Sequence, residues 1–187
     1  MFPMKKRFDI DPGPDSPDIV RMIVEIPKHS SNKYEFDTET GVFKVSRTLY
    51  SPIHYPGDYG FVPGTVAEDG DPLDILCMVN SPSYPGILIY VRPVAVLDMI
   101  DQDQSDHKIL AVPNRDPRYD SITSIDEVPA HWRREIEHFF DIYKELEGKI
   151  TRMEGWRGRD AARQVILESR SRELDRRSRV APAGFIG

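Results

Sequence analysis

The sequence has few of the features that mark a secreted or membrane-spanning protein. Its one cysteine, Cys77, cannot form an internal disulfide, and the apolar run around it favours a buried, inert thiol. No apolar segment approaches the ~20 residues that a membrane-spanning helix needs. The basic residues at positions 5–7 are not followed by an apolar region, which argues against a secretory signal. These absences predict a protein of the reducing cytoplasm with no membrane partner.

Basic residues are also fewer than acidic ones. The chain has 25 lysine and arginine residues against 31 aspartate and glutamate residues, a formal net charge of −6 and a pI of about 5.4. An acidic chain is a poor prior for nucleic-acid binding, so no nucleic-acid partner is expected. An anionic small molecule remains compatible as a substrate, because bound metal ions can invert the local field.

The 187 residues, 39% of them hydrophobic, suit one compact domain with its own core. Short apolar stretches separated by turn residues fill the first two-thirds of the chain, a pattern typical of a small β-barrel or sandwich. Strands are expected at residues 19–27, 34–37, 42–45, 74–79, 88–97 and 107–113. The second and third of these flank a glycine-containing turn and predict a hairpin. The stretch 51–64, rich in proline, glycine and tyrosine, is expected to be irregular.

The last third of the chain changes character. Apolar residues recur at spacings of three and four between Val128 and Leu146, which predicts an amphipathic helix that ends near Gly148. A second helix is expected at about residues 159–177, where interleaved arginines and acids indicate a solvated face. We expect residues 1–18 to form a loosely held arm and residues 180–187 a flexible tail. The fold class is therefore mainly β with flanking helices (α+β).

The most informative motif is the acidic run Asp69-Gly70-Asp71-Pro72-Leu73-Asp74. In an extended segment Asp69 and Asp71 point to the same side, and Pro72 lets the chain bend so that Asp74 approaches them. Three carboxylates at one point repel one another unless a cation lies between them. Mg²⁺ prefers such oxygen ligands, so the run predicts a Mg²⁺ site. An ordinary surface turn is the alternative, because turns favour the same residue types.

A second acidic group, with Asp98, Asp101, Asp103 and Asp106, joins two strand-like segments. Alone it would be a solvated hairpin loop, but across a barrel mouth from the first acidic run it would help to hold several metal ions. Cationic and phenolic side chains that suit phosphate oxygens are spread through the chain, although each taken singly is more simply a surface or packing residue. They are Lys33, Arg47, Tyr55, Tyr59, Lys108, Tyr143 and Lys144.

Further short motifs surround the acidic run. They are Glu25-Ile26-Pro27, Lys33-Tyr34-Glu35, Arg47, Tyr55-Pro56-Gly57-Asp58-Tyr59-Gly60, Arg92-Pro93-Val94, Asp101 with Asp106 and Lys108, Ala111-Val112-Pro113, and His138-Phe139-Phe140 with Tyr143-Lys144. In this order and with this spacing they make the sequence resemble the soluble inorganic pyrophosphatases of family I, whose Asp-x-Asp-Pro-x-Asp signature the acidic run matches. The resemblance covers about residues 19–162 and leaves the N-terminal arm and the arginine-rich end outside it.

The resemblance implies a five-stranded OB-like barrel with C-terminal helices, in a single domain over residues 1–187. It implies hydrolysis of pyrophosphate to two phosphates by a water that bridges metal ions and is activated by Asp71, without a covalent enzyme intermediate. The cofactor would be Mg²⁺, several ions per site, with Mn²⁺ or Zn²⁺ as substitutes. The chain would form a homo-oligomer, with a hexamer favoured.

The resemblance also implies which carboxylates hold the metal ions. Asp69, Asp74 and Asp106 would ligate the tighter metal, and Asp74 would also face a second one. Asp101 and Asp106 would hold a metal that arrives with the substrate, and Glu35 a further one.

Other matching side chains would act on the water or the substrate. Asp71 would be the general base, with Tyr59 hydrogen-bonding near it, and Glu25 and Tyr55 would support the site. The residues implied to bind phosphate oxygens are Lys33, Arg47, Lys108, Tyr143 and Lys144.

Two positions depart from the family pattern. Gln102 follows Asp101 where many members have glutamate, and Ser46 precedes Arg47 where an acid is common.

Two other functions also stay open at this point. OB-like barrels bind oligonucleotides or sugars, and another Mg²⁺-dependent phosphohydrolase would act on nucleotides or organic diphosphates.

Overall fold

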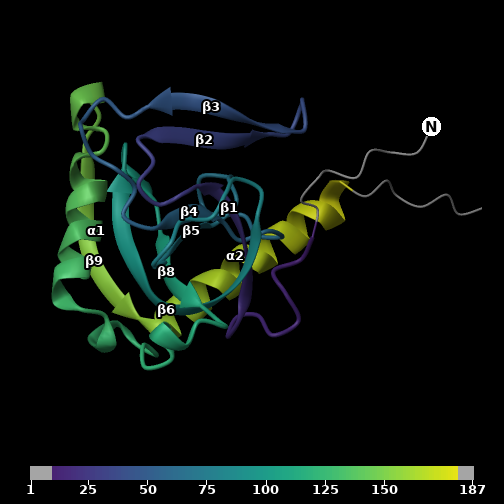
Figure 1. The fold of residues 1–187 in the computed structure, drawn as a ribbon. Helices are drawn as coiled ribbons and strands as arrows, with labels where there is room; N and C mark the ends of the chain where they lie inside the picture. Colours follow the sequence, from purple (N-terminus) through teal and green to yellow (C-terminus); the bar gives the residue numbers. More distant parts are fainter. Residues whose placement is uncertain (1–9, 181–187) are drawn as a thin grey trace, which may run out of the picture.

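The computed structural model describes residues 10–180, and its central feature is a closed ring of five strands (Figure 1). Each strand pairs with the next around the ring, and β6 pairs back onto β1. In ring order the strands are β1 (Val20–Ile26), β4 (Asp58–Phe61), β5 (Asp74–Cys77), β8 (Lys108–Pro113) and β6 (Leu88–Asp101). The expected OB-like barrel is therefore confirmed.

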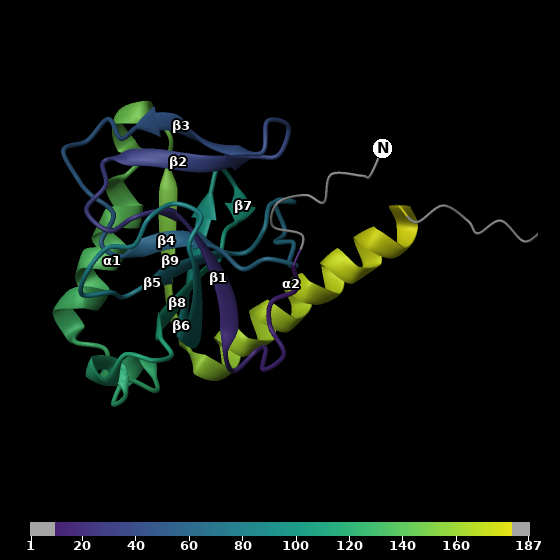
Figure 2. The ribbon, with the colours of Figure 1, turned by 45° about the vertical axis from the view of Figure 1, so that its right-hand side comes forward.

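A hairpin and two further strands extend this ring. β2 (Asn32–Asp37) and β3 (Val42–Thr48) form the predicted antiparallel hairpin, which lies across one end of the ring (Figures 1 and 2). β7 (Gln104–Ser105) and β9 (Thr151–Gly158) both pair with β6. The hairpin and the loops at this end of the ring supply most of the side chains with predicted roles.

Two long helices flank the strands. α1 (Ala130–Ile142) runs along one side of the ring, and α2 (Arg159–Val180) crosses the opposite end from the hairpin and projects past the ring (Figures 1 and 2). Both helices were expected from the sequence. Single turns of 3₁₀ helix are η1 (Pro117–Tyr119), η2 (Ile125–Glu127) and η3 (Glu145–Glu147). No helix within residues 10–180 has the length and apolar character to cross a membrane.

Alternation along the strands divides the core into two clusters. Successive side chains of a strand point to opposite faces, so Ile75 and Cys77 of β5 join one cluster and Leu76 joins the other. The Leu76 cluster includes the α1 side chains Ile136, Phe139 and Phe140. The Ile75 cluster includes the α2 side chains Ala162, Val165 and Ile166. As predicted, Cys77 is a buried free thiol.

The expectation of irregular backbone across residues 51–64 is wrong in part, because β4 occupies four of these positions and is buried throughout. Gly60 explains the error. A Cβ atom on this residue would lie 1.9 Å from the carbonyl oxygen of Ile23 on β1. Glycine is thus required here by a close approach of two strands, although it is more often typical of a loop. β9 was also not expected.

The expectation of a loosely held arm is wrong for residues 10–18, while residues 1–9 lie outside the described part of the chain. The N–H of Arg21 donates to the Pro12 carbonyl oxygen at 2.8 Å, and its guanidinium pairs with Asp11 at 2.7 Å. Asp18 accepts hydrogen bonds from Arg159 and Arg163 of α2 at 3.1 and 3.2 Å. Most of the expected C-terminal tail, residues 181–187, also lies outside the described residues.

Candidate active site

The parallel pairing of β5 with β8 brings predicted site residues together. Ile75 pairs with Ile109, so Asp74 and Lys108, the first residues of the two strands, lie side by side. Lys108 Nζ lies 2.5 Å from Asp74 Oδ2 and 2.5 Å from Asp106 Oδ1. Burial lowers the pKa of Lys108, but the two carboxylates outweigh this effect and raise that pKa overall. Lys108 is therefore a buried ammonium group held between two acids.

A bulge in the β2–β3 hairpin directs Arg47. The register shifts directly after the pair Lys33–Arg47, so Ser46 is the extra residue on β3. Because paired residues project to the same face, the bulge places Arg47 on the face of Lys33. Lys33 Nζ lies 2.7 Å from Oε1 of Glu35 on that same face. Burial raises the pKa of Glu35, but hydrogen bonds from Lys33 and Ser46 outweigh it and lower that pKa.

The acidic run is both a turn and a cluster of carboxylates. Gly70 has a φ of 92°, and its N–H donates to the Ala67 carbonyl oxygen at 3.2 Å. The N–H of Asp71 donates to Asp69 Oδ1 at 3.0 Å. Burial and the charges of Asp69 and Asp74 raise the pKa of Asp71. The turn interpretation thus describes the backbone, and the repulsion between the side chains marks a place that favours a cation.

The loop between β6 and β7 contributes Asp101. Gln102 and Asp103 form the tight turn, with φ values of 50° and 66°. Asp101, just before the turn, forms an ion pair with Lys144. Its Oδ1 atom is buried and has no hydrogen-bond partner in the described part of the chain. Asp98 forms separate ion pairs, with Arg157 and, at 2.7 Å, with His107 Nδ1.

Buried aromatic rings lie beneath the charged groups. The Tyr55 ring centroid is 5.4 Å from that of Tyr59 and 4.7 Å from that of Phe139, and the Phe140 and Tyr143 centroids are 5.6 Å apart. Burial raises the pKa of both Tyr59 and Tyr143 well above the usual range of a phenol. These hydroxyl groups therefore stay protonated and can donate hydrogen bonds to an anion.

Glu25 joins the ring to the hairpin. Its Oε1 atom accepts a hydrogen bond from the N–H of Phe36 on β2 at 3.0 Å. Burial raises the pKa of Glu25 to about 7, and the nearby charge of Asp74 adds to this rise. The side chain thus links β1 to the hairpin that lies over the end of the ring.

Lysine ammonium groups lie where the carboxylates would ligate a metal. Within residues 10–180, no three histidine, cysteine, aspartate or glutamate side chains are close enough together to hold a metal ion. The pairs that are present instead are Lys108 with Asp74 and Asp106, Lys144 with Asp101, and Lys33 with Glu35. The donors are all carboxylate oxygens, which suit Mg²⁺, and the buried Asp101 Oδ1 lacks a partner. The donor set, made of carboxylate oxygens alone, is therefore of the type that a hard divalent cation takes.

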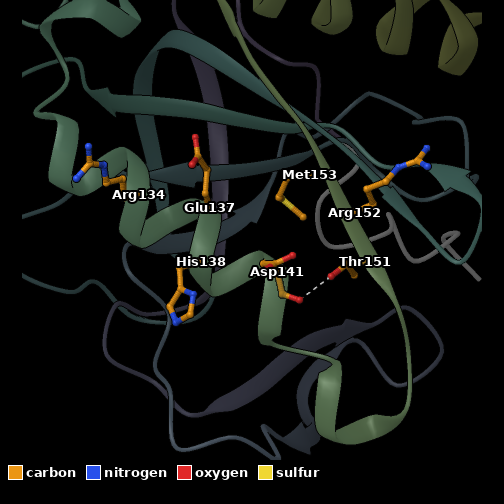
Figure 3. Close-up of a pocket in the computed structure, with 7 residues that line it drawn as sticks. All are labelled: Arg134, Glu137, His138, Asp141, Thr151, Arg152 and Met153. Carbon is orange, nitrogen blue, oxygen red and sulfur yellow. Dashed lines mark hydrogen bonds between the residues drawn. The ribbon is translucent and has the colours of Figure 1, made fainter.

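A cavity of about 450 Å³ lies elsewhere, between α1 and β9 (Figure 3). Figure 3 shows a hydrogen bond between two of its lining residues, in which Thr151 Oγ1 donates to the carbonyl oxygen of Asp141 at 2.9 Å. The residues that line it are Arg134, Glu137, His138, Asp141, Thr151, Arg152 and Met153. None of these described residues has a predicted catalytic, metal-binding or substrate-binding role. The charged group at the hairpin end of the ring is the better candidate, because its titratable groups are shifted by specific partners.

Comparison with known proteins bears on what this group does. The family model for inorganic pyrophosphatase matches residues 22–173 of the chain. The chain belongs to the inorganic pyrophosphatase family. The inorganic pyrophosphatase of Geobacillus stearothermophilus is 48% identical over 150 residues, which cover 80% of this chain and 91% of that protein. The inorganic pyrophosphatase of Methanosarcina acetivorans is 50% identical over 155 residues, 83% of this chain and 92% of that protein.

The structural comparison agrees with family I of the inorganic pyrophosphatases. The crystal structure of the inorganic pyrophosphatase from Thermus thermophilus has a TM-score of 0.88 and 40% identity, covering 91% of this chain and 99% of that one. The chain is therefore an inorganic diphosphatase of a metal-dependent family. The family match extends into α2 as far as residue 173, which is beyond the expected limit near residue 162.

Two contacts of the site were not predicted from the sequence. Ser46, one of the two departures noted in the sequence, lies close enough to Glu35 to help lower the pKa of that carboxyl. Glu147 pairs with Arg47, with 2.6 Å between Oε1 and Nε. The departure at Ser46 was a visible signal, whereas nothing in the sequence around Glu147 indicates its partner.

Proposed function

We propose that this diphosphatase hydrolyses pyrophosphate to two phosphates with Mg²⁺ and without a covalent enzyme intermediate. The observation that supports this is the gathering of carboxylates and cations at the hairpin end of the ring. The charges of Asp69, Asp74, Lys33 and Glu35 all act on the pKa of Asp71. Similar electrostatic influences and ion pairs connect this group to Glu25, Arg47, Tyr55, Tyr59, Asp101, Asp106, Lys108, Tyr143 and Lys144. Such a site suits a highly anionic substrate that binds together with metal ions.

The carboxylates would divide the metal ions between them. Asp69, Asp74 and Asp106 would hold the tighter ion, with Asp74 also facing a second one. Asp101 and Asp106 would hold an ion that arrives with the substrate, and Glu35 a further one. When bound, the ions would supply Lewis acidity and lower the pKa of the attacking water. Mn²⁺ or Zn²⁺ would substitute, because both accept carboxylate ligands.

Asp71 would be the general base that takes the proton of the attacking water. A base must be ionised, and burial with two acidic neighbours raises the pKa of Asp71. Cations among these carboxylates would remove the repulsion and restore the ionised form. Tyr59, which burial keeps protonated, would hydrogen-bond near this base, and Glu25 and Tyr55 would support the arrangement.

Cationic and phenolic groups would hold the phosphate oxygens. Arg47 offers a planar fork of donors, and each lysine offers a point charge. These donors would neutralise the charge that develops on the leaving phosphate, and this positioning with electrostatic stabilisation is what phosphoryl transfer needs. The groups are Lys33, Arg47, Lys108, Tyr143 and Lys144.

The first test measures phosphate release from pyrophosphate, with Mg²⁺ and with a chelator, by the wild-type protein and by Asp71→Asn. We expect Mg²⁺-dependent release, and we expect the variant to keep its fold and lose about 10²–10⁴ in kcat, the usual effect of removing a general base. The control is Asp103→Asn, an exposed position in the β6–β7 turn where asparagine tolerates the positive φ. It should retain wild-type activity.

Two outcomes would contradict the proposal, one in this test and one in the same assay with a nucleoside triphosphate as the substrate. Full activity in Asp71→Asn would remove the assignment of Asp71 as the base. Phosphate release from a nucleoside triphosphate as fast as from pyrophosphate would indicate a broader phosphohydrolase.

We also propose that the chain forms a homo-oligomer, with a hexamer favoured, and works in the cytoplasm. Its lone buried thiol fits a reducing compartment. Large apolar side chains such as Tyr84 and Ile150 are 76% and 83% exposed, and self-association would cover some of this surface. Light scattering after size-exclusion chromatography should give six times the 21.5 kDa chain mass. A single-chain mass would contradict the assembly.

A further inference from the structure

Arg47 does not stand alone at the end of β3. Its Nε atom lies 2.6 Å from Oε1 of Glu147, the last residue of η3. The end of β3 and the turn that follows α1 lie side by side in both views of the ribbon (Figures 1 and 2). The ion pair therefore connects the hairpin to the segment that carries Tyr143 and Lys144.

The pair is largely shielded from water. The Glu147 side chain is 8% exposed and that of Arg47 is 21% exposed. Nε and Nη2 of Arg47 and Oε1 of Glu147 are buried, and no hydrogen bond to a described residue satisfies them. The ion pair is thus the contact that compensates these atoms, and an uncompensated buried charge would be strongly unfavourable.

The geometry divides the guanidinium group into two parts. Glu147 faces the Nε side. Nε and Nη2 are buried without a hydrogen bond to a described residue, whereas Nη1 is not. The bulge at Ser46 places Arg47 on the face of Lys33, which is the face turned to the carboxylate cluster. One side of the group is therefore held by the protein, and the other is available to an anion.

We propose that Glu147 is a positioning residue that acts through Arg47. By fixing the Nε side, it orients the remaining donors toward a substrate phosphate. This inference rests on the proposed function, in which Arg47 binds a phosphate oxygen. A long arginine side chain on a largely exposed strand would otherwise sample many orientations, and pre-orientation of a binding group is a major source of catalytic rate.

Simple electrostatics predicts the opposite effect of removing Glu147. A carboxylate near the site repels an anionic substrate, so its loss would strengthen binding if repulsion were its main effect. Lys149 Nζ lies 3.7 Å from Glu147 Oε2 and offsets part of that charge. The direction of the change in kcat/KM for pyrophosphate therefore separates positioning from repulsion.

The test is a double-mutant cycle with Glu147→Ala, Arg47→Ala and the double variant, measuring kcat and KM for pyrophosphate with Mg²⁺. We expect Glu147→Ala to lower kcat/KM by about tenfold to a hundredfold, the range for a misplaced binding group. In the Arg47→Ala background the same change should have no further effect, because the residue through which it acts is gone. Glu147→Gln, which keeps an oxygen acceptor, should give an intermediate value.

The matched control is Glu145→Ala, which removes an exposed acid of the same 3₁₀ turn and should leave kcat/KM unchanged. An unchanged or raised kcat/KM in Glu147→Ala would overturn the inference, and so would equal losses in both backgrounds. If the wild-type protein releases no phosphate, the proposed function itself fails. If the wild-type protein is active and Arg47→Ala is unaffected, the inference fails while the hydrolysis stands.

Discussion

Glu25 is a largely buried acid of the site, and its pKa lies in the neutral range. Burial raises this pKa from the ordinary value of 4.5 to about 7, against a smaller lowering effect of the hydrogen bond from Phe36. The folded protein therefore binds a proton at Glu25 between these two pH values where the unfolded chain does not.

The free energy of unfolding should consequently fall as the pH rises from about 4.5 to about 7. The contribution of the protonated form is complete below pH 4.5 and is lost as the pH passes through the folded-state pKa. Urea unfolding across this window, with a chelator present, should show a smaller decline for Glu25→Gln than for the wild-type protein. Glu39→Gln, an exposed acid at the hairpin turn, is the control and should follow the wild type. Parallel curves for wild type and Glu25→Gln would contradict this assignment.

At the scale of the elements, the contact of β1 with β4 depends on one glycine. Val24 pairs with Gly60, and this register places Tyr59 beneath the charged cluster. A side chain at Gly60 would collide with the backbone of β1, which cannot move without disturbing the ring.

Gly60→Ala should therefore lower the free energy of unfolding by at least about 2 kcal/mol, the scale of overpacking in a core. Gly158→Ala is the control, because a Cβ atom at Gly158 meets nothing within 4 Å and its φ is not in the left-handed region. Urea denaturation of both variants measures the difference. Equal stability of the two would show that the strands can separate more easily than the structure indicates.

Elements with a strong periodic pattern could be predicted from the sequence, and those defined by contacts with other elements could not. The helix α1 and the hairpin β2–β3 follow directly from apolar spacing and a glycine turn. β4 resembles a loop in sequence because its Gly60 is there for packing, and β9 contains Gly155 with a φ of 116°. The bulge at Ser46 depends on the register with β2, which the residues around Ser46 do not encode.

The same distinction holds for the site. The acidic run, Arg47 and the lysines could be identified from the sequence because they lie in motifs that resemble those of the family. The pairing of Lys108 with Asp74 depends on the register of two strands far apart in the sequence. The contact of Arg47 with Glu147 depends on the packing of a hairpin against a helix end. Such contacts are set by the three-dimensional packing and not by the local sequence.

At the scale of the whole molecule, the accumulation of carboxylates at one end of the ring couples metal binding to stability. Mg²⁺ that binds only the folded protein should raise the free energy of unfolding by about 2.7 kcal/mol at one hundred times its dissociation constant. Thermal unfolding with Mg²⁺ and with a chelator measures this shift. Asp74→Asn should reduce it, whereas Asp103→Asn should retain it. A melting temperature that does not respond to Mg²⁺ would contradict a metal site in the folded chain.

The pairing of β5 with β8 is the one parallel pairing among the described strands, and it has a consequence for how the chain acquires activity. Parallel neighbours cannot be joined by a short turn. The segment between Asp74 and Lys108 contains the long strand β6, so these two residues meet only when distant parts of the chain come together. Contacts between distant segments form slowly compared with local ones such as the β2–β3 hairpin. During refolding, phosphate release should therefore lag behind formation of the β2–β3 hairpin, because the site is complete only once β5 and β8 have paired.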